Sequence, residues 1–321
     1  MPASEMNIRI HRTRVGWAAA AVLRTGVGLA AAVVHRTRLG LAAAAVLAVG
    51  AAPAAAVRGG ADTLVARAAV VMDQVSGQTI FARNPDRRMY PASTTKVMTA
   101  LLAIESGRLD ETVVIQYTDS RVSGTRIGLA PGECITLHDL VYGLLLCSGN
   151  DAANAIARHL AGSQRGFAAL MNARAARLGC ANTHFTNPHG LPNPLHYTTA
   201  RDLGRIMRAA MRNPEFRRIT ATRLYTSQSS WARRAFYNKN KLLGRYPGTT
   251  GGKPGYTRIA QQTLVASAQR AGRELVVVCL HSRGRAVWTD AMRLFDLGFR
   301  SLDAPATASP SPPAETTTGS R

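Results

Sequence analysis

Apolar positions along the chain follow two different periods, and the change of period separates strands from helices. Alternating apolar residues predict two strands within Arg67–Ala82, joined by a turn at Asp73–Gly77. Strand patterns return near the end of the chain, at Gln262–Ala268 and Glu274–Ser282. Apolar residues spaced three and four apart predict helices over Ser93–Glu105, Thr136–Cys147, Asp151–Leu160, Phe167–Leu178, Thr199–Met211 and Val287–Phe299.

This order of elements favours one arrangement. Strands at both ends of a helical middle predict a single sheet that the N- and C-terminal segments complete, with the helical region inserted between them. The sequence therefore predicts a mixed α and β fold. Residues 58–303 form the expected folded domain, which is long enough for one sizeable core.

The two ends of the chain have a different composition. Residues 1–57 hold six arginines, one acid, no lysine and alanine-rich apolar runs, which is typical of an export signal, and Ala56 is the expected cleavage site. His11–Leu23 is nearly repeated as His35–Leu47, so the signal is duplicated or translation starts near Val34. An uncleaved membrane anchor is a second possibility for this segment. Residues 304–321, with four prolines among Ser, Thr and Ala, predict a disordered tail.

The charge of the chain narrows the class of partner. Forty Lys and Arg residues against 18 Asp and Glu give a formal net charge of +22. The arginines are scattered rather than gathered into stripes between aromatic residues, which argues against a nucleic acid as the main partner. A strongly cationic exported protein suits an anionic cell wall or membrane surface. We therefore expect a secreted, wall-associated or membrane-associated monomer.

The first candidate for chemistry is the pair Ser93 and Lys96 in the first turn of an apolar helix, where a spacing of three places both on one face. A serine hydroxyl needs a nearby base, and a lysine serves only if burial or a second cation makes its neutral form accessible. Arginine could not replace it. Lysine occurs only at Lys96, Lys239, Lys241 and Lys253, so we interpret Lys96 and Lys253 as chemically required.

Two further motifs support this pair, which alone would be weak because such residues on one helical face are usually solvated. Ser148-Gly149-Asn150 lies in a turn after a helix. Lys253-Pro254-Gly255-Tyr256-Thr257 follows the glycine-rich stretch Gly248–Gly252 and leads towards a strand. In this order the three motifs match the signature of penicillin-binding proteins and class A β-lactamases.

On these motifs the chain resembles the low-molecular-weight penicillin-binding proteins, the serine-type D-alanyl-D-alanine carboxypeptidases, from about Arg67 to Phe299. Family-typical stretches also occur at Tyr90–Ala100, Asn182–Phe185, His189–Leu191, Tyr197–Leu203, Asn238–Leu243 and Leu264–Ala268. The resemblance implies an α+β fold of the β-lactamase/transpeptidase-like type, with an antiparallel sheet formed by the N- and C-terminal segments. It implies no metal and no organic cofactor.

By this resemblance, Ser93 attacks the carbonyl between the two terminal D-alanines of a peptidoglycan stem peptide, with Lys96 as general base. Ser148 would relay a proton to the leaving amine, and the backbone N–H groups of Ser93 and Tyr256 would form the oxyanion hole. The resemblance implies these substrate-binding residues: Asn150, Lys253, Gly255, Tyr256, Thr257 and Arg285. For Arg285 a surface charge is an equal alternative, and Lys239 and Lys241 are expected to be exposed loop charges.

The chain departs from the family pattern at Pro254, where threonine is usual. Proline removes a hydroxyl and a backbone donor, although an edge strand tolerates it. The rate and substrate preference, rather than the reaction class, are therefore in question. The nearest match to the glutamate motif of class A β-lactamases is Glu215-Phe-Arg-Arg-Ile219, which lacks its asparagine, so penicillin should acylate Ser93 and remain bound.

Two further functions are compatible with the same residues. A D,D-endopeptidase that cuts cross-links would use identical catalytic groups, and a catalytically weak scaffold would bind stem peptides without useful turnover. A β-lactam is the expected inhibitor of either enzyme. His189 is expected to be structural. The four cysteines allow three disulfide pairings and the sequence selects none: Cys134, Cys147, Cys180 and Cys279.

Overall fold

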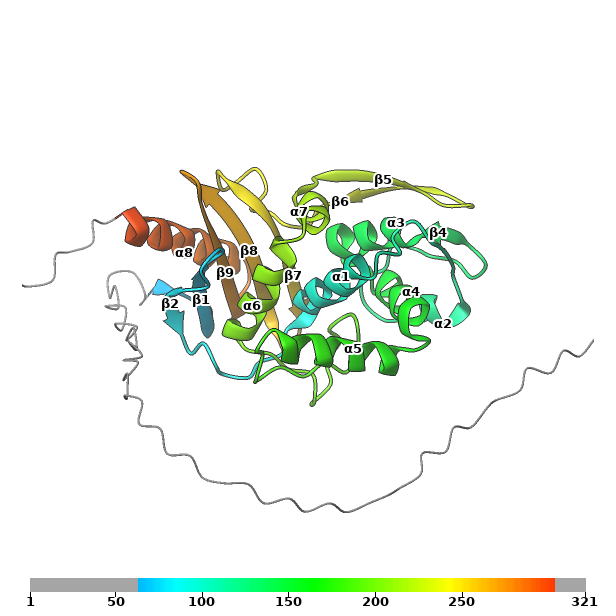
Figure 1. Cartoon of the computed structure of the whole chain (residues 1–321), viewed down its shortest axis with the longest axis horizontal. Helices are drawn as coiled ribbons and strands as arrows, with labels where there is room; N and C mark the ends of the chain where they lie inside the picture. The colour runs from blue at the N-terminus through cyan, green and yellow to red at the C-terminus, as the bar shows by residue number, and fades with distance from the viewer. Residues whose placement is uncertain (1–62, 304–321) are drawn as a thin grey trace, which may run out of the picture. The chain divides into compact units, whose positions relative to one another are not determined.

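A five-stranded antiparallel sheet is the central element of the computed structural model, which describes residues 63–303 (Figure 1). The order of its strands is β2-β1-β9-β8-β7, so the two ends of the described chain pair in the middle of the sheet. The strands are β1 (Ala68–Asp73), β2 (Thr79–Arg83), β7 (Thr249–Thr257), β8 (Gln261–Arg270) and β9 (Arg273–Ser282). The predicted export signal and C-terminal tail lie outside the described residues.

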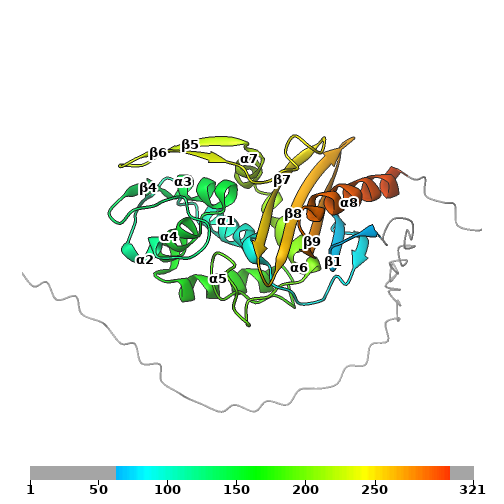
Figure 2. The same cartoon turned by 180° about the vertical axis from the view of Figure 1, so that it is seen from behind.

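Both faces of the sheet are covered by helices, which explains why the apolar run of β9 is continuous. Val276 and Val278 belong to the core on the helical side, whereas Leu275 and Val277 pack with residues of α8 (Ala286–Asp303) on the other face. Because side chains alternate along a strand, a strand buried on both faces needs apolar residues at every position. Figures 1 and 2 show α8 on one side of the sheet and α6 (Ala200–Met211) on the other.

The inserted region is built around α1 (Lys96–Glu105), in which eight of ten residues are buried. Within the described part of the chain, no helix is both long and apolar enough to span a membrane. The short strands are β3 (Thr112–Val114), β4 (Cys134–Thr136), β5 (Leu224–Gln228) and β6 (Arg233–Tyr237). The helices are η2 (Ala92–Thr95), α1 (Lys96–Glu105), α2 (Tyr117–Ser120), α3 (Leu137–Tyr142), η3 (Gly143–Cys147), α4 (Asn150–Ala161), α5 (Gln164–Arg177), α6 (Ala200–Met211) and α7 (Pro214–Ala221).

The predicted α+β arrangement is confirmed, with differences in detail. The helix expected over Ser93–Glu105 begins as the 3-10 turn η2, and the helix expected over Thr136–Cys147 ends as the π-helical turn η3. The segment Lys253–Thr257, expected to lead towards a strand, lies inside β7 itself. Two small two-stranded sheets were missed, β3 with β4 and β5 with β6, because their strands are too short or too polar for a clear alternation.

Candidate active site

Ser93 and Lys96 lie where η2 passes into α1. Ala92, just before them, has a φ of +50°, a left-handed conformation that is uncommon outside glycine and turns the chain into η2. Lys96 Nζ donates a hydrogen bond of 3.1 Å to Ser93 Oγ. The Lys96 side chain is fully buried, whereas Ser93 is half-buried and faces a pocket. The amine therefore contacts the hydroxyl from inside the protein.

Two further acceptors fix the Lys96 amine. Its Nζ donates hydrogen bonds of 2.7 Å to Asn150 Oδ1 and of 2.7 Å to the backbone oxygen of His189. Burial, together with the positive charges of Lys253 and Lys239, holds the pKa of Lys96 well below its ordinary value. The arrangement makes a neutral amine accessible beside a serine hydroxyl, which is what a general base requires.

The His189 side chain has a structural rather than a chemical environment. Its Nδ1 accepts a hydrogen bond of 3.2 Å from the backbone N–H of Leu191, within the turn that presents the His189 carbonyl to Lys96. Burial and the charge of Lys96 lower the pKa of His189 to about 3, so the ring is neutral at physiological pH. The following Gly190 has a φ of +88°, and an added Cβ would lie 1.8 Å from the Ala92 oxygen. The turn therefore packs closely against the segment that precedes the nucleophile.

Ser148 and Asn150 form a second wall of the site, in the turn between η3 and α4. Ser148 adopts a left-handed conformation, with φ of 67° and ψ of 35°, which reverses the chain at the end of η3. Only 6% of Ser148 is exposed, and it lines the same pocket as Ser93. Asn150 Nδ2 donates a hydrogen bond of 2.7 Å to the backbone oxygen of Ser123. The amide therefore joins Lys96 to the neighbouring loop.

Asp151 holds that loop against the site. Its buried carboxylate accepts hydrogen bonds from the backbone N–H groups of residues 127–129. The backbone N–H of Asn150 donates to the oxygen of Thr125 at 2.7 Å, and Thr125 lines the pocket. Thr125 was not predicted from the sequence, because the contact joins segments about 25 residues apart and Thr125 belongs to no motif.

The third wall is β7, whose close approach to the nucleophile depends on Gly255. A Cβ added to Gly255 would lie 2.7 Å from the Ser93 nitrogen and 2.5 Å from Thr263 Oγ1. Both distances are too short for a real side chain, so glycine alone allows this approach. The Gly255 predicted as a substrate-binding residue thus acts here through the spacing between β7 and η2.

Pro254 is accommodated because β7 is the edge strand of the sheet. Proline has no N–H to donate to β8, and its backbone oxygen accepts a hydrogen bond from Lys253 Nζ. Tyr256 lies two residues further along the same strand. The Tyr256 ring is 58% exposed and lines the pocket.

Lys253 supplies a buried cation beside the nucleophile. Only 1% of the residue is exposed, and its Nζ donates a hydrogen bond of 3.1 Å to the backbone oxygen of Pro254. Burial and the charge of Lys239 lower the pKa of Lys253 to about 7. No ion pair within residues 63–303 involves this amine.

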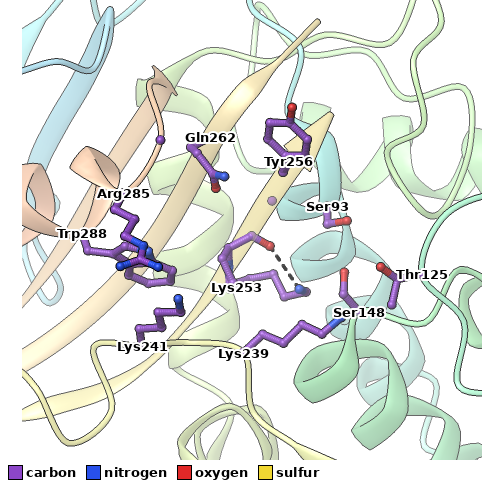
Figure 3. Close-up of a pocket in the computed structure, with 13 residues that line it drawn as sticks. Ser93, Thr125, Ser148, Lys239, Lys241, Lys253, Tyr256, Gln262, Arg285 and Trp288 are labelled. Carbon is purple, nitrogen blue, oxygen red and sulfur yellow. Dashed lines mark hydrogen bonds between the residues drawn. The ribbon is translucent and has the colours of Figure 1, made fainter. Parts of the chain in front are cut away.

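These three walls enclose a pocket of about 540 Å³ (Figure 3). An adjoining hollow of about 340 Å³ shares Ser93, Thr125 and Tyr256 with it. No acidic residue lines either space, among the residues that the structure describes. The hollow contains Thr257, whose Oγ1 accepts a hydrogen bond of 3.1 Å from the Ala260 nitrogen and so stabilises the turn after β7.

Three more cations line the main pocket: Lys239, Lys241 and Arg285. They are exposed, as the sequence predicted for the two lysines, but they face the site rather than an unrelated surface. The structure thus brings all four lysines of the chain to the site or its rim. Their rarity beside 36 arginines was the signal that could have identified Lys239 and Lys241.

The remaining candidate residues lie elsewhere or are inert. Glu215 accepts hydrogen bonds from Arg218 and contacts His138, in a different hollow from Ser93. All four cysteines are free, so none of the three possible sets of disulfides forms. Cys147 is half-buried, and its Sγ donates to the backbone oxygen of Tyr237 at 3.9 Å. It does not line the main pocket.

Comparison with known proteins places this geometry in a family. A family model described as D-alanyl-D-alanine carboxypeptidase, Peptidase_S11, matches residues 55–284. A D-alanyl-D-alanine carboxypeptidase of Mycobacterium tuberculosis is 42% identical over 240 residues, which cover 73% of this chain and 82% of the relative. A D-alanyl-D-alanine carboxypeptidase of Streptomyces strain K15 is 35% identical over 256 residues, which cover 74% of this chain and 88% of the relative.

Comparison with solved structures supports the same family. The crystal structure of a D-alanyl-D-alanine carboxypeptidase from Mycobacterium tuberculosis matches with a TM-score of 0.72 and 40% identity, covering 77% of this chain and 94% of that one. The Streptomyces K15 DD-transpeptidase matches with a TM-score of 0.71 and 32% identity, covering 74% of this chain and 98% of that one. The chain therefore belongs to the Peptidase_S11 family of D-alanyl-D-alanine carboxypeptidases and is a serine peptidase with a transpeptidase-like fold.

Proposed function

We propose that this enzyme hydrolyses the peptide bond between the two terminal D-alanines of peptidoglycan stem pentapeptides, through an acyl-enzyme on Ser93. The observation that carries the proposal is the contact of 3.1 Å between Ser93 Oγ and the buried amine of Lys96. Burial and neighbouring cations lower the pKa of that amine. A serine held beside such a base is an activated nucleophile.

In acylation, the neutral Lys96 amine takes the proton from Ser93 Oγ, and the oxygen bonds to the carbonyl carbon of the penultimate D-alanine. The oxyanion lies between the backbone N–H groups of Ser93 and Tyr256, whose segments are in close contact because residue 255 is glycine. The C–N bond then breaks, and the leaving amine receives a proton relayed through Ser148.

The two adjoining spaces divide the substrate around the scissile bond. The terminal D-alanine lies in the main pocket, where Lys253 attracts its carboxylate and Ser148 lies beside the leaving amine. The acyl part extends into the hollow lined by Asn150 and Thr257. Water then attacks the ester with Lys96 again as base, which releases the shortened peptide and restores Ser93.

The same chemistry makes the enzyme a target of β-lactams. Ser93 opens the lactam ring and forms an ester that water must hydrolyse. A class A β-lactamase uses a glutamate to activate that water. No acidic residue lines the pocket or the hollow in the described chain, and Glu215 is paired elsewhere. We expect a long-lived adduct.

We further propose that the enzyme acts outside the cytoplasm, since its proposed substrate is peptidoglycan. We also propose that it is a monomer. The alanine-rich segment of residues 1–57 supports export. Expression of the full chain in a bacterium tests this: N-terminal sequencing of the exported protein distinguishes cleavage near Ala56 from anchoring, and light scattering gives the oligomeric state. Protein retained in the cytoplasm would contradict export.

The catalytic proposal is tested with the purified protein and Ser93→Ala. Intact mass after incubation with benzylpenicillin should show a single adduct on the wild type and none on the variant. Free D-alanine should appear from a pentapeptide with the wild type only. Peptide binding without D-alanine release by the folded wild type would refute hydrolysis and favour a binding scaffold.

A further inference from the structure

The main pocket carries more positive charge than the leaving group of a carboxypeptidase requires. Beyond Lys253, as seen from Ser93, the pocket is lined by the exposed side chains of Lys241 and Arg285 and by Trp288 of α8 (Figure 3). Neither cation takes part in an ion pair with any acid of the described chain. A free D-alanine carries one carboxylate, for which Lys253 and Arg285 suffice, so Lys241 is left as a further cation of the pocket.

The loop that presents the lysines is held in a fixed conformation. Asn238 Nδ2 donates to the backbone oxygens of Thr220, in the last turn of α7, and of Thr222, just after it, at 3.1 and 2.8 Å. Asn240 Oδ1 accepts from the nitrogen of Leu242, which is fully buried. The asparagines therefore face the protein, and the alternating Lys239 and Lys241 face the pocket. A charged side chain on an anchored loop loses less conformational entropy when it binds an anion than one on a mobile loop.

The size of the pocket also indicates a leaving group larger than one D-alanine. A volume of about 540 Å³ is in the range of sites that take drug-sized ligands, which are much larger than one alanine. Trp288 adds an apolar ring to the wall that carries these cations, so a ligand here combines methylene groups with negative charge.

We propose that Lys241, beside Trp288, forms a second anion subsite, which takes a leaving group that bears a further carboxylate. The proposal rests on the hydrolysis proposed above and leaves its bonds unchanged: the ester on Ser93 forms, the C–N bond breaks, and the leaving amine takes the proton. A second carboxylate has two sources, an acidic D-amino acid at the C-terminus or the acceptor strand of a cross-linked stem peptide.

The test compares peptides that share one donor sequence and end in D-Ala-D-Ala, D-Ala-D-Glu or the neutral isostere D-Ala-D-Gln. The measurement is kcat/KM for release of the terminal amino acid. For wild type we expect D-Glu to exceed D-Gln by about threefold, since an exposed cation contributes a factor of about two to five. This ratio should fall as salt screens the charges.

Substitution at Lys241 should change the ratio of D-Glu to D-Gln. Lys241→Gln should lower it about threefold, and Lys241→Glu should reverse the preference. Arg245→Gln removes the same charge from the same loop at a residue that does not line the pocket, so it should leave the ratio unchanged. Titration of Ser93 with benzylpenicillin confirms that each variant has a folded site.

The outcomes separate this proposal from the proposed hydrolysis. Failure of wild type to release D-alanine from D-Ala-D-Ala would overturn the hydrolysis itself. Normal D-alanine release, with equal rates for D-Glu and D-Gln and no Lys241-dependent cleavage of a cross-linked dimer, would overturn the subsite alone. Lys241-dependent cleavage of a purified cross-linked dimer would support the subsite and assign it to cross-linked peptides. D-Glu preference without dimer cleavage would support the subsite and assign it to acidic D-amino acids.

Discussion

Replacing Gly255 by alanine should separate β7 from the nucleophile with little other change. The new Cβ would lie 2.7 Å from the Ser93 nitrogen and 3.1 Å from the Thr94 nitrogen. Ordinary contact begins at 3.4 Å, so the strand must move by about 0.7 Å. Both neighbouring atoms belong to the backbone of η2 and cannot rotate away, unlike the hydroxyl of Thr263.

The expected loss of acylation rate follows from the oxyanion-hole donor that lies on β7. The proposed oxyanion hole has one donor on η2 and the other on β7, and loss of one such donor costs about 100-fold to 1,000-fold in rate. A displacement near 1 Å has a similar cost of about 100-fold. We therefore expect acylation of Gly255→Ala by benzylpenicillin to slow by about 100-fold. Crowding should lower the free energy of unfolding by about 1 to 3 kcal/mol.

The assay is the second-order rate of adduct formation, followed by intact mass, together with urea unfolding. Gly272→Ala is the control: its φ is +76° and nothing lies within 4 Å of an added Cβ, in the turn between β8 and β9. Backbone strain there should cost about 1 kcal/mol of stability without slowing acylation. A folded Gly255→Ala enzyme that acylates within threefold of wild type would refute the argument from close approach.

Three other perturbations test separate features. Lys239→Gln should raise the pKa of Lys253 above about 7, because it removes a nearby positive charge, and so move the pH profile of acylation to higher pH; an unmoved profile would contradict this coupling. Pro254→Thr should speed acylation by restoring a hydroxyl and a backbone donor beside the substrate, and unchanged kinetics would show that neither is needed. Glu133→Gln should lower the free energy of unfolding by about 3 kcal/mol in a urea titration, because Arg234 then lacks the fully buried carboxylate that it contacts. A loss below about 0.5 kcal/mol would mean that this ion pair contributes no more than a solvent-exposed one.

Local pattern was enough to predict β1, β2, β8 and β9 of the sheet and the central helix, but not the edge strand β7. In β9 the apolar run has no polar interruption from Leu275 to Leu280, which only a strand buried on both faces requires. The spacing of Ser93 and Lys96 predicted a shared face, and the structure has their polar atoms in contact. In both cases the information lies within one element, where periodicity determines direction.

Contacts between distant segments could not be predicted in this way. Thr125 reaches the site because Asn150 binds its backbone oxygen and Asp151 anchors the residues that follow it. Backbone groups act there as donors and acceptors, and every residue type has them, so the sequence carries no sign of the pairing. Gly255 was predicted as a residue that binds substrate, whereas its geometric importance is visible only once Ser93 lies against it.

The distribution of lysine and arginine reflects different physical demands. Arginine keeps its proton in nearly any environment and suits the ion pairs that hold the fold, such as the one between Arg158 and Asp119. The site needs cations whose protonation depends on burial and on neighbouring charges. Burial and the neighbouring lysines lower the pKa of both Lys96 and Lys253. Only lysine can lose its proton in this way. In a chain so rich in arginine, Lys96 and Lys253 therefore mark positions where an ordinary fixed charge would not serve.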